Sequence, residues 1–281
     1  MKAVIPAAGF GTRFLPLTKA QPKEMLPVVN KPTIQWVVEE AVDAGITDIA
    51  IITGEHKQSI ENHFKPIEKL EKSLKEAGKF KELEEINKIN DIANIDFIIQ
   101  KEQKGLGHAI LCAEDFVGDG PFAILLGDTI CTGNPNCTKG LVNFFNDKKS
   151  SVFSVEKIRP EDTERYGIIS GDMLEDGVML VKALVEKPSL EEAPSLLGIQ
   201  GRYIFTPDIF NYLRETSSGS GGEIQLTDAM ESMAQVRDIY SWTFSGKRYD
   251  IGTMRDWFQS HLELSANSNF SNILKEVLQK L

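Results

Sequence analysis

The chain opens with Met1-Lys-Ala-Val-Ile-Pro-Ala-Ala-Gly-Phe-Gly-Thr-Arg13, the stretch that decides its fold. The apolar run Ala3–Pro6 predicts a buried strand, and small residues with two glycines follow it directly. Small residues let a ligand approach the backbone, so that fixed N–H groups can bind phosphate oxygens or the edge of a base. Arg13 and Lys23 add two cations at the same end of the strand. We therefore expect this end of the strand to hold a polyphosphate.

Two common glycine motifs do not fit this stretch. The dinucleotide-binding fingerprint requires a third glycine three residues after the second, and Phe14 stands at that position. The P-loop requires Gly-Lys-Ser/Thr after a four-residue gap, and the stretch does not supply it. A strand followed by Gly-x-Gly is also consistent with an ordinary tight turn. Motifs farther along the chain are needed to decide between a binding loop and a turn.

Length and composition limit the classes of protein. The 281 residues suffice for one large α/β domain or two small ones. The formal net charge of -10 argues against wrapping nucleic acid, because a phosphate backbone requires a basic face. The sequence has neither a long apolar segment nor a signal peptide, and Cys112, Cys131 and Cys137 lack metal-ligand spacing. We expect a cytoplasmic protein with no membrane or nucleic-acid partner.

Strands and helices alternate in the first half of the chain. Apolar runs predict strands at 3–6, 48–53, 95–100 and 122–126, with helices at 34–44 and 107–113. This alternation predicts an α/β fold with a mainly parallel sheet and helices on both faces. Ligands of such sheets bind at the carboxyl ends of the strands, where the candidate site residues of this half all lie.

The rest of the chain follows other patterns. Apolar residues recur every three to four positions in the charged segment 65–91, which predicts an arm of two amphipathic helices bent at Gly78. Farther on, the sequence predicts strands at 151–156, 167–170, 178–186 and 202–205, and helices at 207–215, 256–264 and 270–281. The glycine- and serine-rich segment 217–222 predicts a flexible loop.

Several motifs occur in the order seen in one enzyme family. They are Gly9–Arg13, Pro22–Pro27, Gly105–Ala109, Leu126–Asp128, Tyr166-Gly167, Val185–Pro188, Gly201–Tyr203, Gln225–Asp228 and Tyr249–Gly252. With them the chain resembles the sugar-1-phosphate nucleotidylyltransferases. The resemblance implies a Rossmann-like mixed sheet in a single domain, 1–264, with a C-terminal helical segment, 265–281. Nucleotide binding is then expected mainly in 1–137 and sugar binding mainly in a smaller β subregion within 138–252.

Two motifs narrow the expected substrates. Gly105-Leu-Gly-His-Ala109 and Pro22-Lys-Glu-Met-Leu-Pro27 resemble the branch that uses UTP and glucose 1-phosphate. The resemblance implies a Mg²⁺-dependent, reversible reaction in a homo-oligomer, dimer or tetramer. In it the sugar phosphate attacks the α-phosphorus of UTP in line and yields UDP-glucose and pyrophosphate. The alternatives are the same chemistry with dTTP or another sugar, and a non-catalytic nucleotide-sugar-binding regulator.

The resemblance also implies roles for charged residues. Arg13, a planar donor fork, suits the β- and γ-phosphates, and Lys23 suits the α-phosphate, where charge builds in the transition state. Asp128 and Asp250 each follow a predicted strand or segment end and are expected to bind Mg²⁺ together with substrate phosphates. Without the family motif Lys23 would be interpreted as an exposed loop lysine, and each aspartate as a turn or capping residue.

Base and sugar recognition require other groups. The amide of Gln100 suits the uracil edge, with Gln103 as its competitor. The expected nucleotide-binding backbone comes from Ala8, Gly9, Gly11, Thr12 and Gly105.

For the sugar phosphate the resemblance implies Glu186 and Lys187, with Gly167 and Gly201 as glycines of close approach. Neighbouring side chains of a strand point to opposite faces, so both charged groups reach one ligand only where the strand ends, as Pro188 indicates. An ordinary exposed strand edge is the alternative for this pair.

Overall fold

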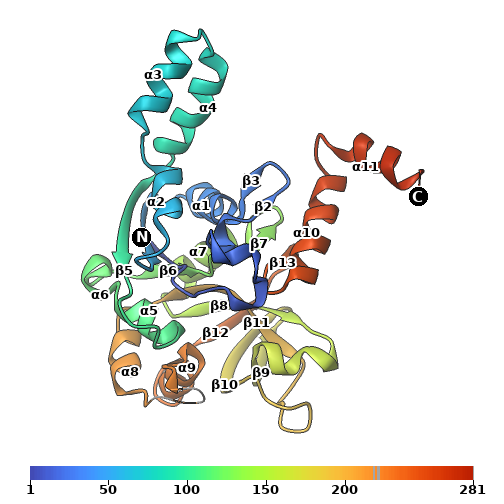
Figure 1. The fold of residues 1–281 in the computed structure, drawn as a ribbon. Helices are drawn as coiled ribbons and strands as arrows, with labels where there is room; N and C mark the ends of the chain where they lie inside the picture. Colours follow the sequence, from blue (N-terminus) through green and yellow to red (C-terminus); the bar gives the residue numbers. More distant parts are fainter. Residues whose placement is uncertain (218, 220–221, 281) are drawn as a thin grey trace.

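A mixed sheet forms the centre of the molecule. The computed structural model describes residues 1–217, 219 and 222–280. Within these residues nine strands make the sheet, in the order β5-β4-β1-β6-β11-β8-β12-β10-β9 (Figure 1). Both halves of the chain contribute to it, because β6 of the first half pairs with β11 of the second.

The parallel part of the sheet comes from the first half of the chain. Its strands are the expected apolar runs, β1 (Lys2–Pro6), β4 (Asp48–Thr53), β5 (Asn94–Ile99) and β6 (Phe122–Leu125). They pair in parallel, with β1 between β4 and β6. Their predicted positions are confirmed to within one residue, and their carboxyl ends meet at one edge of the sheet.

The second half adds mostly antiparallel pairs. Its strands are β8 (Val152–Lys157), β9 (Gly167–Glu175), β10 (Val178–Glu186), β11 (Leu197–Phe205) and β12 (Tyr240–Thr243). Of these, only β8 and β12 pair in parallel. Both β9 and β11 are longer than their apolar patterns predict. Their extra residues are held by backbone pairing, as where the exposed end of β9 continues its hairpin with β10.

Helices cover both faces of the sheet, as the sequence predicts. One face packs against α5 (Leu106–Leu111), α8 (Ile209–Glu215) and α9 (Leu226–Ala234). The other packs against α1 (Thr33–Asp43), α2 (Gln58–Phe64) and α7 (Cys137–Lys148). Each face carries its own buried apolar cluster, so the sheet is the middle layer of three.

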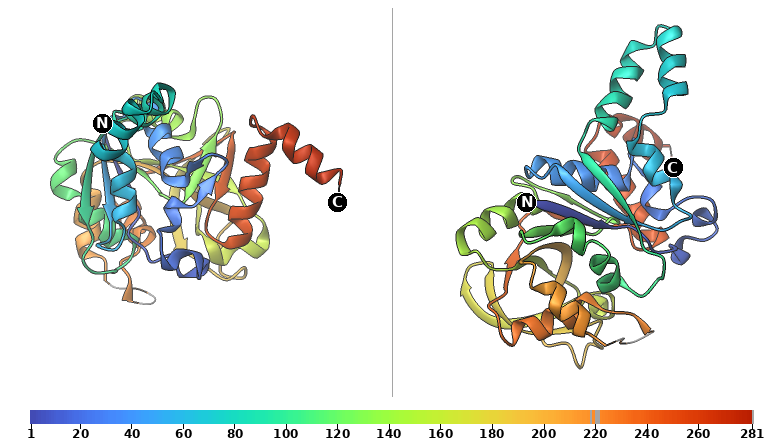
Figure 2. Two further views of the ribbon diagram at one scale, coloured as in Figure 1. Left: turned by 45° about the horizontal axis from the view of Figure 1, so that its top comes forward. Right: turned by 90° about the vertical axis from the view of Figure 1, so that its left-hand side faces the viewer.

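Two helical parts extend from this body. The arm consists of α3 (Glu68–Glu76) and α4 (Phe80–Asn90), and it projects from the body in Figure 1 and in the right-hand view of Figure 2. Gly78 lies between these helices with a φ of 70°, a conformation that suits glycine, as the predicted bend requires. At the other side, α10 (Met254–Ala266) leads into α11 (Ser271–Leu278), which points away from the sheet.

Shorter elements complete the chain. They are β2 (Pro27–Val28) with β3 (Lys31–Pro32), β7 (Thr129–Thr132) with β13 (Lys247–Asp250), α6 (Glu114–Val117), and the 3-10 turns η1 (Thr12–Phe14), η2 (Leu17–Lys19), η3 (Lys23–Met25) and η4 (Pro160–Arg165). The predicted loop 217–222 falls partly outside the described residues. None of the described helices combines the length and the apolar character needed to cross a membrane.

Candidate active site

A cavity of about 310 Å³ lies at the carboxyl ends of β1 and β6. Its lining combines the loop after β1, the η3 turn, the Gly105 region and the end of β6. The residues lining it are Pro6, Ala7, Ala8, Gly9, Lys23, Glu24, Gln100, Gln103, Gly105, Leu106, Ala109, Leu126, Asp128 and Glu223. Six residues singled out as nucleotide, catalytic or metal sites from the sequence are among them: Ala8, Gly9, Lys23, Gln100, Gly105 and Asp128.

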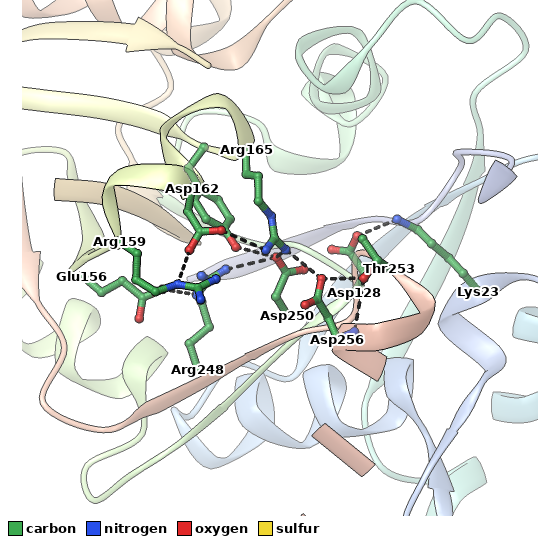
Figure 3. Close-up of polar contacts among 11 residues, drawn as sticks. Lys23, Asp128, Glu156, Arg159, Asp162, Arg165, Arg248, Asp250, Thr253 and Asp256 are labelled. Atoms are coloured by element: carbon green, nitrogen blue, oxygen red, sulfur yellow. Dashed lines mark hydrogen bonds and ion pairs between the residues drawn. The ribbon is translucent and has the colours of Figure 1, made fainter. Parts of the chain in front are cut away.

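Lys23 and Asp128 form an ion pair in this cavity. Nζ of Lys23 donates to Oδ2 of Asp128 over 2.5 Å, and the two side chains are 22% and 25% exposed (Figure 3). Burial opposes the charge on Lys23, but the Asp128 and Glu24 carboxylates outweigh it and raise its pKa. Burial likewise opposes the charge on Asp128, and the Lys23 ammonium lowers its pKa below the ordinary value. Both groups are therefore charged and still open to the cavity.

Asp250 lies beside Asp128 because of the small sheet β7–β13. Asp250 pairs with Thr129 in that ladder, and the N–H of Ile251 donates to the carbonyl oxygen of Asp128 over 2.8 Å. Two carboxylates from distant parts of the sequence thus reach one edge of the central sheet, as expected. In the described residues no cluster of three or more His, Cys, Asp or Glu residues is suited to a metal ion, so this edge offers a pair of carboxylates.

Oδ2 of Asp250 accepts hydrogen bonds from two side chains. The Tyr166 hydroxyl donates to it over 2.7 Å. Nη2 of Arg165 donates to it over 3.0 Å (Figure 3). Arg165 also donates to Asp256 over 2.8 Å, which ties the η4 turn to the start of α10. Burial raises the pKa of Asp250, and Asp128 raises it further, although the nearby Arg248 counteracts them. The sequence motif contained Tyr166, but nothing in the local pattern indicated that it holds Asp250.

Gln100 is fixed at the base of the cavity. It is buried, and its Nε2 donates to the carbonyl oxygen of Gly105 over 3.2 Å and lies 2.9 Å from Nδ1 of His108. Gly105 has a φ of 93°, and a Cβ there would lie 2.7 Å from Cβ of Glu223. Gln103 also lines the cavity, from an exposed position. The structure therefore brings both competing glutamines to the site and holds Gln100 more firmly.

A second cavity, of about 570 Å³, lies at the end of β10 and contains Glu186 and Lys187. Oε2 of Glu186 accepts from the Thr227 hydroxyl over 2.6 Å, and Oε1 accepts from Nζ of Lys187 over 2.6 Å. Lys187 has a φ of 47°, an uncommon left-handed conformation for a residue with a side chain. This backbone turn lets two neighbouring side chains meet, in agreement with the prediction that the strand ends here. Glu223 lines both cavities and so connects them.

The two glycines of the predicted sugar site lie where a side chain would collide. A Cβ on Gly167 would lie 2.9 Å from the Thr227 hydroxyl, and one on Gly201 would lie 2.8 Å from Leu126. Gly201 also has a φ of 83°. Its neighbour Arg202 is fully buried and donates to the carbonyl oxygen of Thr129, next to Asp128. The loop that carries Asp128 is thereby anchored to β11.

Three of the residues predicted for catalysis or nucleotide binding lie outside the lining of the first cavity. Gly11, Thr12 and Arg13 form the start of the η1 turn, and the side chains of Thr12 and Arg13 are exposed. Gly11 has a φ of 67°, and a Cβ there would lie 3.3 Å from Cβ of Lys23. The turn therefore packs directly against the side chain of Lys23, while Arg13 is available to solvent.

Comparison with known proteins identifies the class. The family model for nucleotidyl transferases matches residues 2–267, so the chain belongs to the nucleotidyl transferase family. The UTP–glucose-1-phosphate uridylyltransferase of Bacillus subtilis is 50% identical to it over 264 residues, which are 94% of this chain and 90% of that protein. The enzyme of the same name from Staphylococcus epidermidis is 47% identical and covers 100% of this chain and 98% of its own. The family resemblance noted in the sequence is thus confirmed.

Solved structures agree with this assignment. A UDP-glucose pyrophosphorylase complexed with UDP-glucose superposes with a TM-score of 0.87 at 41% identity, over 95% of this chain and 99% of that one. The UTP-bound enzyme from Acinetobacter baumannii superposes with a TM-score of 0.91 at 34% identity, over 100% and 99% of the two chains. The predicted α/β fold is therefore confirmed.

Proposed function

We propose that this protein transfers the uridylyl group of UTP to glucose 1-phosphate and releases pyrophosphate. The observation that carries the proposal is the Lys23–Asp128 pair, which places a cation and a carboxylate in the cavity beside the loop after β1. The close relatives with this activity and the UTP-bound neighbour support the choice of substrates. The cavity at the end of β10 would take the sugar.

In this reaction a phosphate oxygen of glucose 1-phosphate attacks the α-phosphorus of UTP. The bond from that phosphorus to the oxygen of the β-phosphate breaks, and pyrophosphate leaves with its electron pair. Negative charge builds on the α-phosphate oxygens, and the Lys23 ammonium stabilises it. Arg13, exposed on the neighbouring turn, would bind the β- and γ-phosphates as they leave. Positioning and charge account for most of such catalysis.

The residues at the sheet edge fit a hard divalent cation. Mg²⁺ is commonly bound by one or two carboxylates together with substrate phosphates, and Asp128 and Asp250 supply two. When bound, it would neutralise charge on the triphosphate. Tyr166 and Arg165 hold one oxygen of Asp250, so the orientation of this carboxylate is set by the protein.

Base recognition is assigned to Gln100 and the backbone around it. Because Nε2 of Gln100 is already bonded within the protein, its carbonyl oxygen would accept the N3–H of uracil. Backbone groups of Ala8, Gly9 and Gly105, all in the cavity lining, would complete the pocket, with Gly11 and Thr12 nearer the phosphates.

The sugar site is assigned to the second cavity. Glu186 would accept hydrogen bonds from glucose hydroxyls, and Lys187 would bind the sugar phosphate. Gly167 and Gly201 are assigned to the sugar site as glycines of close approach, because a Cβ on either would press on Thr227 or Leu126. We also propose the division expected from the sequence, with 1–137 mainly for the nucleotide and 138–252 mainly for the sugar, and assembly into a homo-oligomer.

The decisive experiment measures pyrophosphate release with four nucleoside triphosphates against several sugar 1-phosphates. We expect the highest kcat/KM for UTP with glucose 1-phosphate. A maximum with dTTP or another sugar would assign the protein to a different substrate within the family. Binding without turnover for every pair would instead favour a nucleotide-sugar-binding regulator.

A further inference from the structure

A buried lysine lies behind the lining of the nucleotide cavity. Nζ of Lys57 donates to the carbonyl oxygen of Ala7 over 2.6 Å and to Oε2 of Glu24 over 2.8 Å. The Lys57 and Glu24 side chains are only 1% and 2% exposed. Burying two charges costs free energy unless their geometry is good and further hydrogen bonds satisfy them. This ammonium meets that condition through two close acceptors.

The two acceptors belong to different segments of the cavity lining. Ala7 begins the loop after β1, and Glu24 follows Lys23 within the η3 turn. Ala7, Lys23 and Glu24 all line the cavity, whereas Lys57 lies behind it. One ammonium group therefore connects the backbone of the proposed nucleotide loop to the turn that carries the proposed catalytic lysine.

The turn that carries Lys57 is closed by a hydrogen bond of its own. It follows β4, and the N–H of Lys57 donates to the carbonyl oxygen of Gly54 over 2.9 Å. His56 in the same turn stacks on Phe10, with ring centroids 4.8 Å apart and an interplanar angle of 16°. The turn 54–57 thus contacts the loop after β1 at two positions, one buried and one exposed.

We propose that Lys57 is a positioning residue for nucleotidyl transfer, an inference that rests on the proposed function. It holds the loop 7–9 and the η3 turn at a fixed separation, so that the Lys23 ammonium meets the α-phosphate of a nucleotide bound on that loop. Lys57 itself need not touch the substrate. Its effect is expected on turnover, because small displacements of a reacting group from its charged partner slow the chemical step.

The test compares Lys57→Met with Lys65→Met. Lys65 lies at the end of α2 and pairs with Glu61 on the exposed surface, so it controls for loss of a nearby lysine charge. Lys57→Met is expected to lower kcat about 100-fold, the effect of a misplacement of about 1 Å. Its KM for glucose 1-phosphate should change less than about threefold, since the sugar site is untouched. Lys65→Met should retain the wild-type values.

Because Lys57→Met leaves the Glu24 carboxylate unpaired, the double variant Lys57→Met/Glu24→Leu tests the structural alternative. Replacing a buried ion pair by apolar side chains often restores stability. We expect the double variant to regain much of the melting temperature but not the kcat. Wild-type kcat in the folded double variant, or in folded Lys57→Met, would overturn the proposal. A double variant that is slow while Lys57→Met is fast would also overturn it, because Glu24 would then act alone.

Hydrogen exchange gives a readout that does not depend on activity. In folded Lys57→Met we expect faster amide exchange in residues 7–13 and 23–26 than in Lys65→Met. Equal exchange in the two variants would overturn the positioning role. If the wild-type protein releases no pyrophosphate with any substrate pair, the proposed function fails, while faster exchange would still support Lys57 as the residue that fixes the two segments.

Discussion

Two lysine–carboxylate pairs meet at consecutive residues of the η3 turn and differ in their surroundings. Lys23 pairs with Asp128 over 2.5 Å, with both side chains partly exposed to the cavity. Glu24 pairs with Lys57 over 2.8 Å and is sealed from solvent. The carboxylates near Lys23 raise its pKa against the effect of burial, whereas burial dominates at Lys57 and lowers its pKa.

On the proposed function, this difference separates a pair that acts on the substrate from a pair that holds the scaffold. A partly exposed ammonium can exchange its carboxylate for a substrate phosphate without leaving a buried charge unpaired. A sealed pair cannot do so, because removal of either partner leaves the other charge buried and unpaired. In a 3-10 turn successive side chains point about 120° apart, so adjacent residues can serve these two purposes.

The largest effect is expected from Asp128 and Asp250, whose carboxylates are partly exposed. Excess chelator, or Asp128→Asn, should lower kcat by about 10³-fold, equivalent to about 4 kcal/mol, because charge on the triphosphate is then not neutralised. Asp250→Asn should give a similar loss. Steady-state pyrophosphate release with and without Mg²⁺ checks this, and full activity in chelator would refute the assignment of these aspartates.

The sealed pair should dominate stability. Lys57→Met is expected to lower the free energy of unfolding by about 3–5 kcal/mol, since it leaves the Glu24 carboxylate buried and unpaired. Lys65→Met should change it by less than about 1 kcal/mol, because the Lys65–Glu61 pair is exposed. Urea denaturation of both variants measures the difference. Equal unfolding midpoints would mean that the two pairs do not differ as proposed.

Lys23→Ala should act on turnover more than on UTP binding. We expect a loss of about 3–4 kcal/mol in transition-state stabilisation, as for one preorganised electrostatic group. Single-turnover kinetics combined with calorimetric UTP binding separates the two quantities. A variant that loses affinity in proportion to rate would place Lys23 among ground-state contacts.

Lys187→Ala extends the comparison to the second cavity. Its main effect should be a higher KM for glucose 1-phosphate, by about 10- to 100-fold, as for the loss of a charged hydrogen bond to the substrate. The kcat at saturating sugar phosphate should fall far less than in Lys23→Ala. Measured KM and kcat for both variants decide this, and exchanged phenotypes would show that the two lysine roles are reversed.

The smallest effect concerns the base. Cytosine has an acceptor where uracil has N3–H, so a mismatch at Gln100 should cost about 1–3 kcal/mol. We expect a strong preference for UTP over CTP, a weaker one over dTTP, and loss of the CTP discrimination in Gln100→Ala. Steady-state kinetics with the three triphosphates tests it. If Gln103→Ala abolishes the discrimination and Gln100→Ala preserves it, the exposed glutamine reads the base.

Local patterns were sufficient for much of the fold. Strands in the parallel half and the helices around Gly78 agree with prediction because apolar periodicity directly reflects burial of one face or one strand. The far end of β9 was missed because its side chains are exposed and only backbone pairing with β10 extends it. The start of β11 was missed although it is buried, because Gly198, Gln200 and Gly201 interrupt its apolar pattern. The division into nucleotide and sugar regions stays a prediction.

The sequence by itself determined the family, the strand–loop–lysine motif and the placement of Asp128 at a strand end, since these depend on residues close together in the chain. Tertiary structure alone decided which groups meet. Lys23 finds Asp128 across 105 positions, and Asp250 reaches them through the β7–β13 ladder. Glu24 accepts a hydrogen bond from Lys57, and Glu186 accepts one from Thr227, although the partners lie far apart in the sequence. Such contacts depend on strand order and register, which bring distant segments together and leave no periodic signal in either segment.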